Sequence, residues 1–293
     1  MYTTLISVAQ LQALNASGAP LQVFDCSFDL AQPQAGRAMF AQSHIAGAVY
    51  ADLNTDLSVK GDPAVTGALS GGRHPLPARE AFAQWLSAKG FDNTKQAVVY
   101  DRQGVNYCGR MWWMLKWLGH DAVAVLDGGL QAWTAQGGAL ASGDQAAPSA
   151  PGAPAGAFTV SASKVAFVDA STVHKQLGRP TQTIVDARAT PRFKGEVEPL
   201  DPVAGHIPGA LNRPFGLNLT PEGFFKPAAV LRAELDALLG ARPASSVVHH
   251  CGSGVSAIPN VLAMEIAGLS GSALFAGSWS EWCSDPARPV AIG

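Results

Sequence analysis

Four short motifs occur twice in this chain, in the same order in each half. Each pair shares residue types: an aspartate after an apolar run, a His-Ile-x-Gly-Ala segment, a polar residue after a valine-rich run, and a glycine turn that leads to tryptophan. The paired segments are residues 25–26 with 186–188, 44–48 with 206–210, 98–101 with 249–251, and 126–133 with 275–282. Four ordered pairs indicate a duplicated domain, so we expect two copies of one folding unit.

The two copies differ in length. The stretch from His44 to Asp101 is longer than its counterpart from His206 to Cys251, which indicates an insertion in the first copy, at the glycine- and proline-rich residues 61–77. Residues 141–157 are almost entirely alanine, glycine, proline and serine, a composition that predicts a flexible linker. We therefore expect an N-terminal domain at residues 1–140, the linker at residues 141–157 and a C-terminal domain at residues 158–293.

Short β-branched runs alternate with helical patterns in each copy. Residues 183–185 and 246–248 are expected strands, and residues 111–118 and 228–239 are expected helices. This alternation predicts an α/β fold in which each copy forms a parallel sheet flanked by helices on both faces. Ligands of such sheets bind beyond the carboxyl ends of the strands.

Composition excludes several classes of protein. The chain has 20 basic and 22 acidic side chains, so its net charge of −2 gives no reason to expect nucleic acid or an anionic membrane as a partner. No apolar run reaches the roughly 18 residues of a membrane helix, and the first basic residue is Arg37, which is unlike a signal peptide. Four cysteines without C-x-x-C spacing favour reduced thiols and a cytoplasmic location over a zinc site or a disulfide scaffold.

Cys251 is the strongest candidate for chemistry. It follows an apolar strand-like run and opens a loop of small residues that leads into a helical pattern at residues 258–269. This geometry directs backbone N–H groups and a helix N-terminus at one point, where they would lower the pKa of a thiol. A buried, unreactive cysteine is the simplest alternative. A phosphate-binding loop lacks its Gly-Lys ending here, and a cysteine phosphatase would need an arginine where Ala257 stands.

The combined motifs resemble the tandem rhodanese sulfurtransferases. The resemblance rests on the paired halves and on residues 186–188, 192–195, 205–210, 251–257 and 277–282. In that family the C-terminal copy carries the catalytic cysteine and the N-terminal copy has lost it. Asp101 stands at the equivalent position of the first copy, so the resemblance implies one active site in each chain.

The family divides by sulfur donor. Enzymes that act on thiosulfate carry basic residues after the cysteine, whereas enzymes that act on 3-mercaptopyruvate carry Cys-Gly-Ser-Gly-Val-Thr. This chain differs from the second pattern only at Ser256, which keeps the hydroxyl. The resemblance assigns Arg192 to the substrate and Arg188 to the substrate or a supporting role. The mercaptopyruvate enzymes use a second arginine to bind the substrate carboxylate. This chain has Asp201 at that position, and thiosulfate enzymes also have an aspartate there, so we expect the pair of arginines that clamps the carboxylate to be incomplete.

The family also brings a histidine from the first domain towards the catalytic loop, and His74 stands at that position. Ser253 matches the serine of a proposed Ser–His–carboxylate relay, but Asn54, flanked by Asp52 and Asp56, stands where its carboxylate belongs. An exposed loop histidine is the alternative reading of His74. The remaining motif histidines are expected to be structural: His44, His206, His249 and His250.

The expected reaction transfers sulfur from 3-mercaptopyruvate to Cys251, which becomes a persulfide, and then to a thiol such as thioredoxin or to cyanide. Stabilisation of the persulfide would come from backbone N–H groups of Gly252, Ser253, Gly254, Val255 and Ser256. This chemistry requires no metal and no organic cofactor. A thiosulfate:cyanide sulfurtransferase and a non-enzymatic persulfide carrier are the alternatives.

Overall fold

The computed structural model describes residues 1–61, 63–143 and 157–293, so most of the predicted linker at residues 141–157 lies outside the described residues. The chain divides into two compact units. The first contains Met1–Val59, Pro77–Lys164 and Glu222–Phe224, and the second contains Lys60–Leu76, Val165–Pro221 and Phe225–Gly293. Residues 60–76 therefore pack with the second unit, although they lie within the first sequence copy.

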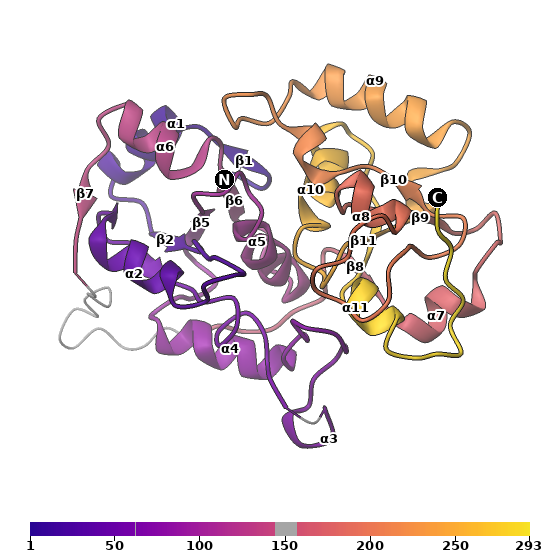
Figure 1. Ribbon diagram of the computed structural model, residues 1–293. Coiled ribbons are helices and arrows are strands. Elements are labelled where there is room, and N and C mark those ends of the chain that lie inside the picture. Colours follow the sequence, from indigo (N-terminus) through magenta and orange to yellow (C-terminus); the bar gives the residue numbers. More distant parts are fainter. Residues whose placement is uncertain (62, 144–156) are drawn as a thin grey trace. The chain divides into compact units, whose positions relative to one another are not determined.

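The first unit is built on a five-stranded parallel sheet with the strand order β1-β6-β5-β2-β4. Its strands are β1 (Leu5–Ile6), β2 (Leu21–Asp25), β4 (Val49–Tyr50), β5 (Gln96–Tyr100) and β6 (Val123–Leu126), and a short antiparallel pair joins β3 (His44–Ile45) to β7 (Leu140–Ala141). Helices flank the sheet (Figure 1). They are α1 (Val8–Ala16), α2 (Ala35–Gln42), α4 (Arg79–Ala88), α5 (Cys108–Trp117) and α6 (Gly129–Ala135).

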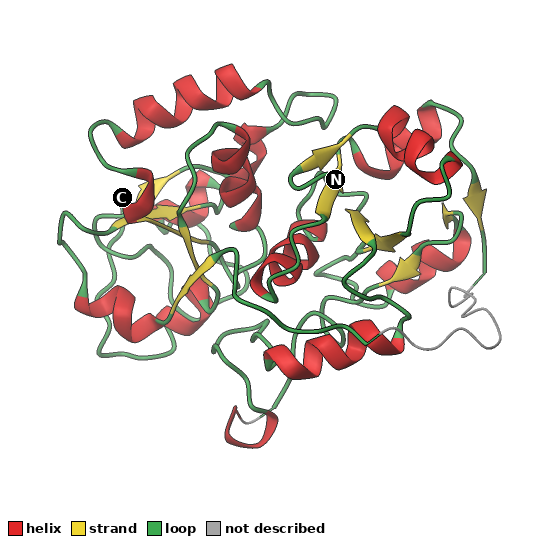
Figure 2. Cartoon of the chain, turned by 180° about the vertical axis from the view of Figure 1, so that it is seen from behind, coloured by secondary structure: helices red, strands yellow, loops and turns green. Residues whose placement is uncertain are grey.

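The second unit repeats this arrangement with the strand order β10-β9-β11-β12-β8, again all parallel. The strands are β8 (Ala166–Val168), β9 (Thr183–Asp186), β10 (Leu211–Asn212), β11 (Val247–His250) and β12 (Ala273–Phe275). The helices are α3 (Pro63–Thr66), α7 (Ala170–Lys175), α8 (Thr190–Lys194), α9 (Ala228–Leu239), α10 (Ile258–Ile266) and α11 (Ser278–Trp282), with 3-10 turns at η1 (Phe215–Asn218) and η2 (Ala244–Ser246). Figure 2 shows the helices around each group of strands.

The two sheets match strand for strand when each strand is paired with its sequence counterpart. β2 corresponds to β9, β5 to β11 and β6 to β12, and both sheets place them in the same order. The prediction of a duplicated α/β fold with parallel sheets is confirmed. Within the described residues, no helix combines the length and the hydropathy of a membrane-spanning segment.

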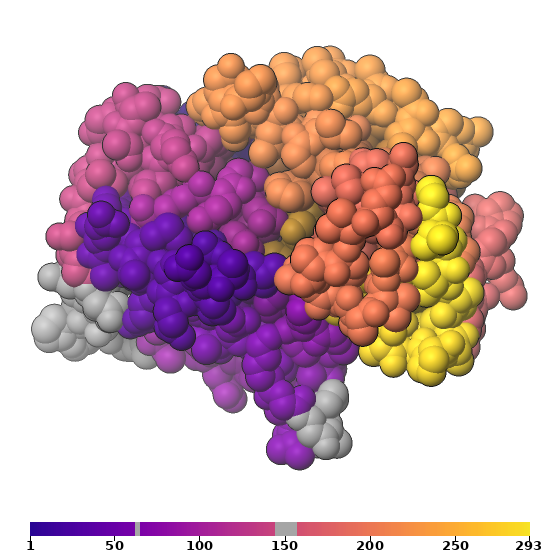
Figure 3. All heavy atoms as spheres, viewed as in Figure 1, coloured from indigo at the N-terminus to yellow at the C-terminus, as the bar shows by residue number. Residues whose placement is uncertain are grey.

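Burial explains why the elements form where they do. Every residue of α5 is buried, so the apolar pattern at residues 111–118 belongs to a central helix of the first unit. The predicted helix at residues 228–239 coincides with α9, which buries Leu231, Leu235 and Leu239 and leaves its other face at the surface (Figure 3, orange). The strand predicted from Ser246 begins one residue later, because Ser246 ends the turn η2.

Candidate active site

Cys251 directly follows β11, at the carboxyl end of the second sheet. In the register of the sheet, His250 of β11 pairs with Asp186 of β9, so the next residue of the chain emerges where both strands end. The loop from Cys251 to Ala257 then leads into α10, whose first turn contains Pro259. Cys251 lies at the position where parallel sheets bind ligands. The Cys251 residue is buried, with only 2% of its surface exposed.

Two glycines shape the loop after Cys251. Gly254 has a φ of +74°, and a Cβ at this position would lie 2.0 Å from the carbonyl oxygen of Ala276, so only glycine fits. A Cβ on Gly252 would lie 2.8 Å from Nη2 of Arg73 and 3.6 Å from Nη1 of Arg192. The missing side chain of Gly252 therefore leaves the space beside Cys251 to two guanidinium groups.

The segment that opens α11 fixes the backbone of the cysteine loop. The N–H of Cys251 donates to Oγ of Ser278 at 3.1 Å, and the Ser278 hydroxyl donates to the carbonyl of Phe275 at 2.9 Å. The N–H of Trp279 donates to the carbonyl of Cys251, and the N–H of Ser280 donates to the carbonyl of Gly252. Ser278 has a φ of +54°, a left-handed conformation that costs a non-glycine residue about 1–2 kcal/mol. Strain is thus retained at the residue that accepts a hydrogen bond from the N–H of Cys251.

His74 contacts the same loop. Its Nδ1 lies 2.7 Å from Oγ of Ser253, and both residues are buried. The two residues belong to one unit, since residues 60–76 pack with the C-terminal half. His74 is therefore a buried partner of the loop that follows Cys251, and the alternative of an exposed loop histidine is wrong.

The same α11 segment also holds the loop that carries His74. The N–H of Arg73 donates to Oγ of Ser280 at 3.1 Å. A Cβ on Gly72 would lie 2.5 Å from the carbonyl of Gly277, so this glycine allows the two backbones to approach closely. Burial raises the pKa of Glu281, and the N–H of Gly71 offsets part of that rise by donating to the carboxyl group. One segment therefore positions the cysteine loop and the histidine loop together.

The two arginines beside Gly252 are bound by buried carboxylates. Arg192 of α8 donates from Nη2 to Oε1 of Glu198 at 2.6 Å and to Oδ2 of Asp201 at 3.3 Å. Arg73 donates from Nη1 to Oδ1 of Asp201. Burial alone would raise the pKa of Glu198, but the hydrogen bonds from Arg192 and from the N–H groups of Leu200 and Asp201 lower it below its usual range. Glu198 is therefore ionised and fixes Arg192.

Arg188 lies deeper and has other partners. Its guanidinium donates to both carboxylate oxygens of Asp186 and to the carbonyl of Gly205, and it lies 4.6 Å above the ring of Trp279. Burial would raise the pKa of Asp186, but His250 and Arg188 hold it below the usual range. These partners occupy Nε and Nη2 of Arg188, so its geometry fits a supporting role better than direct contact with a substrate.

Asp101 occupies the matching position in the first unit, directly after β5. Four backbone N–H groups donate to its carboxylate at 2.8–3.0 Å, from Gln103, Val105, Tyr107 and Cys108. Both loops run from a strand end into a helix, but Val105 has a φ of +67°, unlike Val255. The first copy thus shows how a loop of this length surrounds a negative charge with main-chain donors.

Four other histidines make internal contacts. Nδ1 of His44 lies 2.8 Å from the carbonyl of Phe40, whose ring it stacks on, and His206 makes the same two contacts with Phe193. His250 lies with Nε2 3.5 Å from Asp186. Burial lowers the pKa of His249 to about 3, and its Nε2 faces the sulfur of Met264 at 3.0 Å.

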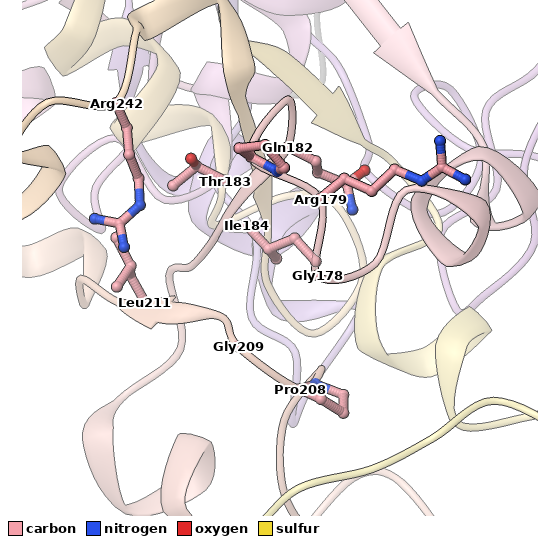
Figure 4. Close-up of a pocket in the computed structure, with 10 residues that line it drawn as sticks. Gly178, Arg179, Gln182, Thr183, Ile184, Pro208, Gly209, Leu211 and Arg242 are labelled. Atoms are coloured by element: carbon pink, nitrogen blue, oxygen red, sulfur yellow. The ribbon is translucent and has the colours of Figure 1, made fainter.

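A surface pocket of about 360 Å³ lies at the opposite end of the second sheet. It is lined by residues at the start of β9 and around it, including Thr183, Ile184, Arg179 and Arg242. Figure 4 shows the guanidinium groups of Arg179 and Arg242 well apart, so they do not converge on one ligand. The pocket is at the amino ends of the strands, away from the position of Cys251.

The rhodanese-like domain family matches residues 7–136 and 169–285. The chain is 44% identical, over the whole of both proteins, to a probable 3-mercaptopyruvate sulfurtransferase of Pseudomonas aeruginosa. It is 38% identical to a putative thiosulfate sulfurtransferase of Mycobacterium tuberculosis, over 99% of this chain and 97% of that protein. The structure of a 3-mercaptopyruvate sulfurtransferase from Leishmania major superposes with a TM-score of 0.81 at 30% identity, covering 96% of this chain and 74% of that one.

The chain therefore belongs to the rhodanese family, with one rhodanese-like domain in each half. The predictions of a tandem rhodanese fold and of a sulfurtransferase enzyme are confirmed by these matches. Sequence reasoning gave no role to Arg73, Ser278 or Glu198. The two adjacent glycines before Arg73 could have indicated that this loop packs closely against another backbone, because glycines allow such an approach.

Proposed function

We propose that this chain transfers sulfur from 3-mercaptopyruvate, through a persulfide on Cys251, to a thiol acceptor. The observation that supports this most is the neutral loop after Cys251 combined with the guanidinium of Arg192 beside Gly252. The names of the Pseudomonas aeruginosa and Leishmania major relatives point to the same donor. The proposal explains why guanidinium groups are supplied to this loop by residues outside it.

The other three cysteines are poor nucleophiles. Burial raises the pKa of Cys26, Cys108 and Cys283, and in the first two the nearby carboxylates raise it further. Their thiols stay protonated at neutral pH, and a protonated thiol does not attack sulfur. Cys251 opens the loop that leads from β11 into α10 and that contains Ser253, the partner of His74.

In the first step the Cys251 thiolate attacks the sulfur of 3-mercaptopyruvate. An S–S bond forms, the C–S bond breaks, and its electron pair goes to carbon as the enolate of pyruvate. The proton of the substrate thiol ends on that carbon, so pyruvate leaves and Cys251 keeps an anionic persulfide. Ser253, hydrogen-bonded to His74, is the group we assign to this proton transfer.

Main-chain donors stabilise the persulfide in this proposal. We assign this role to the N–H groups of Gly252, Ser253, Gly254, Val255 and Ser256, because four N–H groups of the equivalent loop in the first copy donate to the carboxylate of Asp101. Arg192 holds the carboxylate of the substrate, and Arg188 supports the site through Asp186 and Trp279.

The second step regenerates the enzyme. The thiolate of an acceptor attacks the outer sulfur of the persulfide, the S–S bond breaks, and Cys251 leaves as thiolate. A dithiol protein such as thioredoxin is the acceptor we propose, in the cytoplasm, and cyanide would accept the same sulfur as thiocyanate. Two half-reactions that share one covalent intermediate predict ping-pong kinetics.

Thiosulfate is the second candidate donor. Asp201 stands where an arginine would favour mercaptopyruvate, and the relative from Mycobacterium tuberculosis is named for thiosulfate. Thiosulfate is a compact dianion, and the loop from Gly252 to Ala257 offers it no cationic side chain. The lack of a cationic side chain in the loop favours 3-mercaptopyruvate, which carries one carboxylate, over thiosulfate.

The test measures pyruvate release from 3-mercaptopyruvate with a thiol acceptor, and thiocyanate release from thiosulfate with cyanide. We expect a higher kcat/KM for 3-mercaptopyruvate, and we expect Cys251→Ser to abolish turnover while Cys283→Ser retains it. Unchanged pyruvate release by Cys251→Ser would contradict the role of this residue. A higher kcat/KM for thiosulfate would reverse the choice of donor. A persulfide that forms only with a partner desulfurase would identify a carrier instead of an enzyme.

A further inference from the structure

Arg73 reaches the catalytic loop from a distant part of the sequence. It lies in the loop of residues 60–76, which packs with the second unit. Its Nη2 is 2.8 Å from the point that a Cβ on Gly252 would occupy, closer than either terminal nitrogen of Arg192, at 3.6 and 3.8 Å. Two guanidinium groups therefore stand beside the residue that follows the nucleophile.

Asp201 holds these two guanidinium groups together. One carboxylate oxygen accepts from Nη1 of Arg73 and the other accepts from Nη2 of Arg192. The Asp201 side chain is almost completely buried, and burial raises its pKa although Arg73 opposes the rise. The sequence predicted an incomplete carboxylate clamp at Asp201, whereas in the structure this acid orients two arginines.

The hydrogen-bond donors of Arg73 leave one edge of the guanidinium without a protein partner. Nη1 is bound to Asp201, whereas Nε is buried and has no hydrogen-bond partner among the described residues. Nη2 faces Gly252. Nε and Nη2 share the edge of a guanidinium that binds a carboxylate with two parallel hydrogen bonds. A buried donor without a partner is costly, which indicates that a ligand satisfies it.

We propose that Arg73 binds the carboxylate of the sulfur donor through Nε and Nη2, together with Arg192, and so selects 2-oxo acids that carry a thiol. This inference rests on the proposed function and names the residue that completes its substrate site. Asp201 is the positioning residue for both arginines.

The charges of the cluster favour a monoanion. Three arginines face three carboxylates, so the cluster is balanced before a substrate enters; the residues are Arg73, Arg188, Arg192, Asp186, Glu198 and Asp201. A carboxylate adds one negative charge, whereas thiosulfate adds two next to a thiolate. Since charge interactions are strong where water is excluded, the second charge disfavours thiosulfate.

The first experiment compares steady-state kinetics of Arg73→Gln, Arg73→Lys and the control Arg232→Gln. Arg232 is a half-exposed arginine of α9 whose ion pair is with Asp236, so the control removes the same charge at the surface. Arg73→Gln is expected to raise the KM for 3-mercaptopyruvate by about 10-fold or more, with a smaller change in kcat, because a bidentate pair contributes in the ground state and the transition state alike. Arg73→Lys keeps the positive charge but cannot donate two parallel hydrogen bonds to a carboxylate, so we expect a smaller rise in the KM than in Arg73→Gln.

The second experiment needs no turnover. We compare the alkylation rates of Cys251 by iodoacetate, which carries a carboxylate, and by neutral iodoacetamide, with the labelled site identified from peptide masses. The ratio of the two rates is expected to fall at least about threefold in Arg73→Gln and to stay unchanged in Arg232→Gln. Gly252→Ala serves as a second variant, because its Cβ displaces Nη2 of Arg73 without removing a charge, and Gly252 has no left-handed backbone that would forbid alanine.

The outcomes separate the two proposals. If the wild-type chain releases no pyruvate from 3-mercaptopyruvate, the proposed function fails, and the alkylation ratio still decides whether Arg73 attracts a carboxylate. If pyruvate is released but Arg73→Gln leaves both the KM and the alkylation ratio within twofold of wild type, Arg73 does not bind the donor. A KM of Arg73→Lys equal to that of the wild type would also overturn the inference, because a positive charge paired with Asp201 would then be enough, without the two parallel hydrogen bonds from Nε and Nη2.

Discussion

The carboxylate of Asp101 offers a direct test of how a strand-to-helix loop holds negative charge. It accepts four backbone hydrogen bonds in a buried position of the first unit. Asp101→Asn keeps the shape of the side chain but replaces one of the two oxygens with an NH₂ group. Because each oxygen accepts two bonds, that NH₂ group then faces two N–H donors, either those of Tyr107 and Cys108 or those of Gln103 and Val105. At least two charge-assisted bonds are lost, each contributing about 1.5–3 kcal/mol. We expect a loss of about 3 kcal/mol or more in the free energy of unfolding.

Urea unfolding followed by tryptophan fluorescence measures this loss. Five of the seven tryptophans lie in the first unit: Trp85, Trp112, Trp113, Trp117 and Trp133. With a urea dependence of about 2 kcal/mol per molar, the midpoint should fall by about 1.5 M. The control is Asp92→Asn, which makes the same chemical change at a surface turn, where the carboxylate accepts from the N–H and the hydroxyl of Thr94.

Hydrogen exchange gives the local readout. The amides of Val105, Tyr107 and Cys108 should lose protection in Asp101→Asn and keep it in Asp92→Asn. A loss of stability below about 1 kcal/mol with unchanged protection would refute the reasoning, because the loop would then hold its amides in place without an anion. The argument for main-chain stabilisation of a persulfide at Cys251 would lose its closest parallel.

Two further predictions concern the second unit. Ser278→Ala removes two buried hydrogen bonds, including that from the N–H of Cys251, and should lower the free energy of unfolding by about 2 kcal/mol. Ser278→Gly loses the same bonds but relieves the strain of the left-handed backbone, so its loss should be about 1 kcal/mol smaller. Urea unfolding compares the pair, and an alanine variant as stable as the glycine variant would contradict the claim of strain. The pKa of His249 falls from 6.5 to about 3 on folding, so the unfolded chain binds a proton that the folded chain does not, and this residue should cost about 2 kcal/mol of stability between pH 7 and pH 5. His249→Leu should lose correspondingly less stability over that interval, and an identical pH dependence in the variant would show that His249 is not buried as a neutral ring.

Local sequence patterns predicted most of the fold. The duplication, the strands around Val185 and Val248, and the helix at residues 228–239 depend on short-range periodicity and on paired motifs, both of which can be read along the chain. The sequence also placed Cys251 in a small-residue loop between a strand and a helix, as the structure has it, and its role as the nucleophile stays a prediction. Each strand, helix and motif is encoded within a short stretch of sequence, and the duplication follows from comparing such stretches between the two halves.

The rest of the site depends on contacts between distant segments. Arg73 and Asp201 are 128 positions apart, and Cys251 and Ser278 are 27 apart. Cys251 and Ser278 meet because each follows one of the paired strands β11 and β12. Arg73 is brought to this site by the packing of residues 60–76 against α11, which no periodicity describes. The left-handed backbone of Ser278 was equally hidden, because serine is not a residue that a sequence marks for that conformation.

Residues 60–76 are encoded in the first half of the chain but pack with the second. The halves are therefore not interchangeable modules, even though their sheets share one topology. A gene truncated to residues 158–293 would encode the cysteine and Arg192 but neither His74 nor Arg73. Fission of such a gene into independent single-domain proteins would separate Cys251 from the histidine and the cation that residues 60–76 bring to its loop.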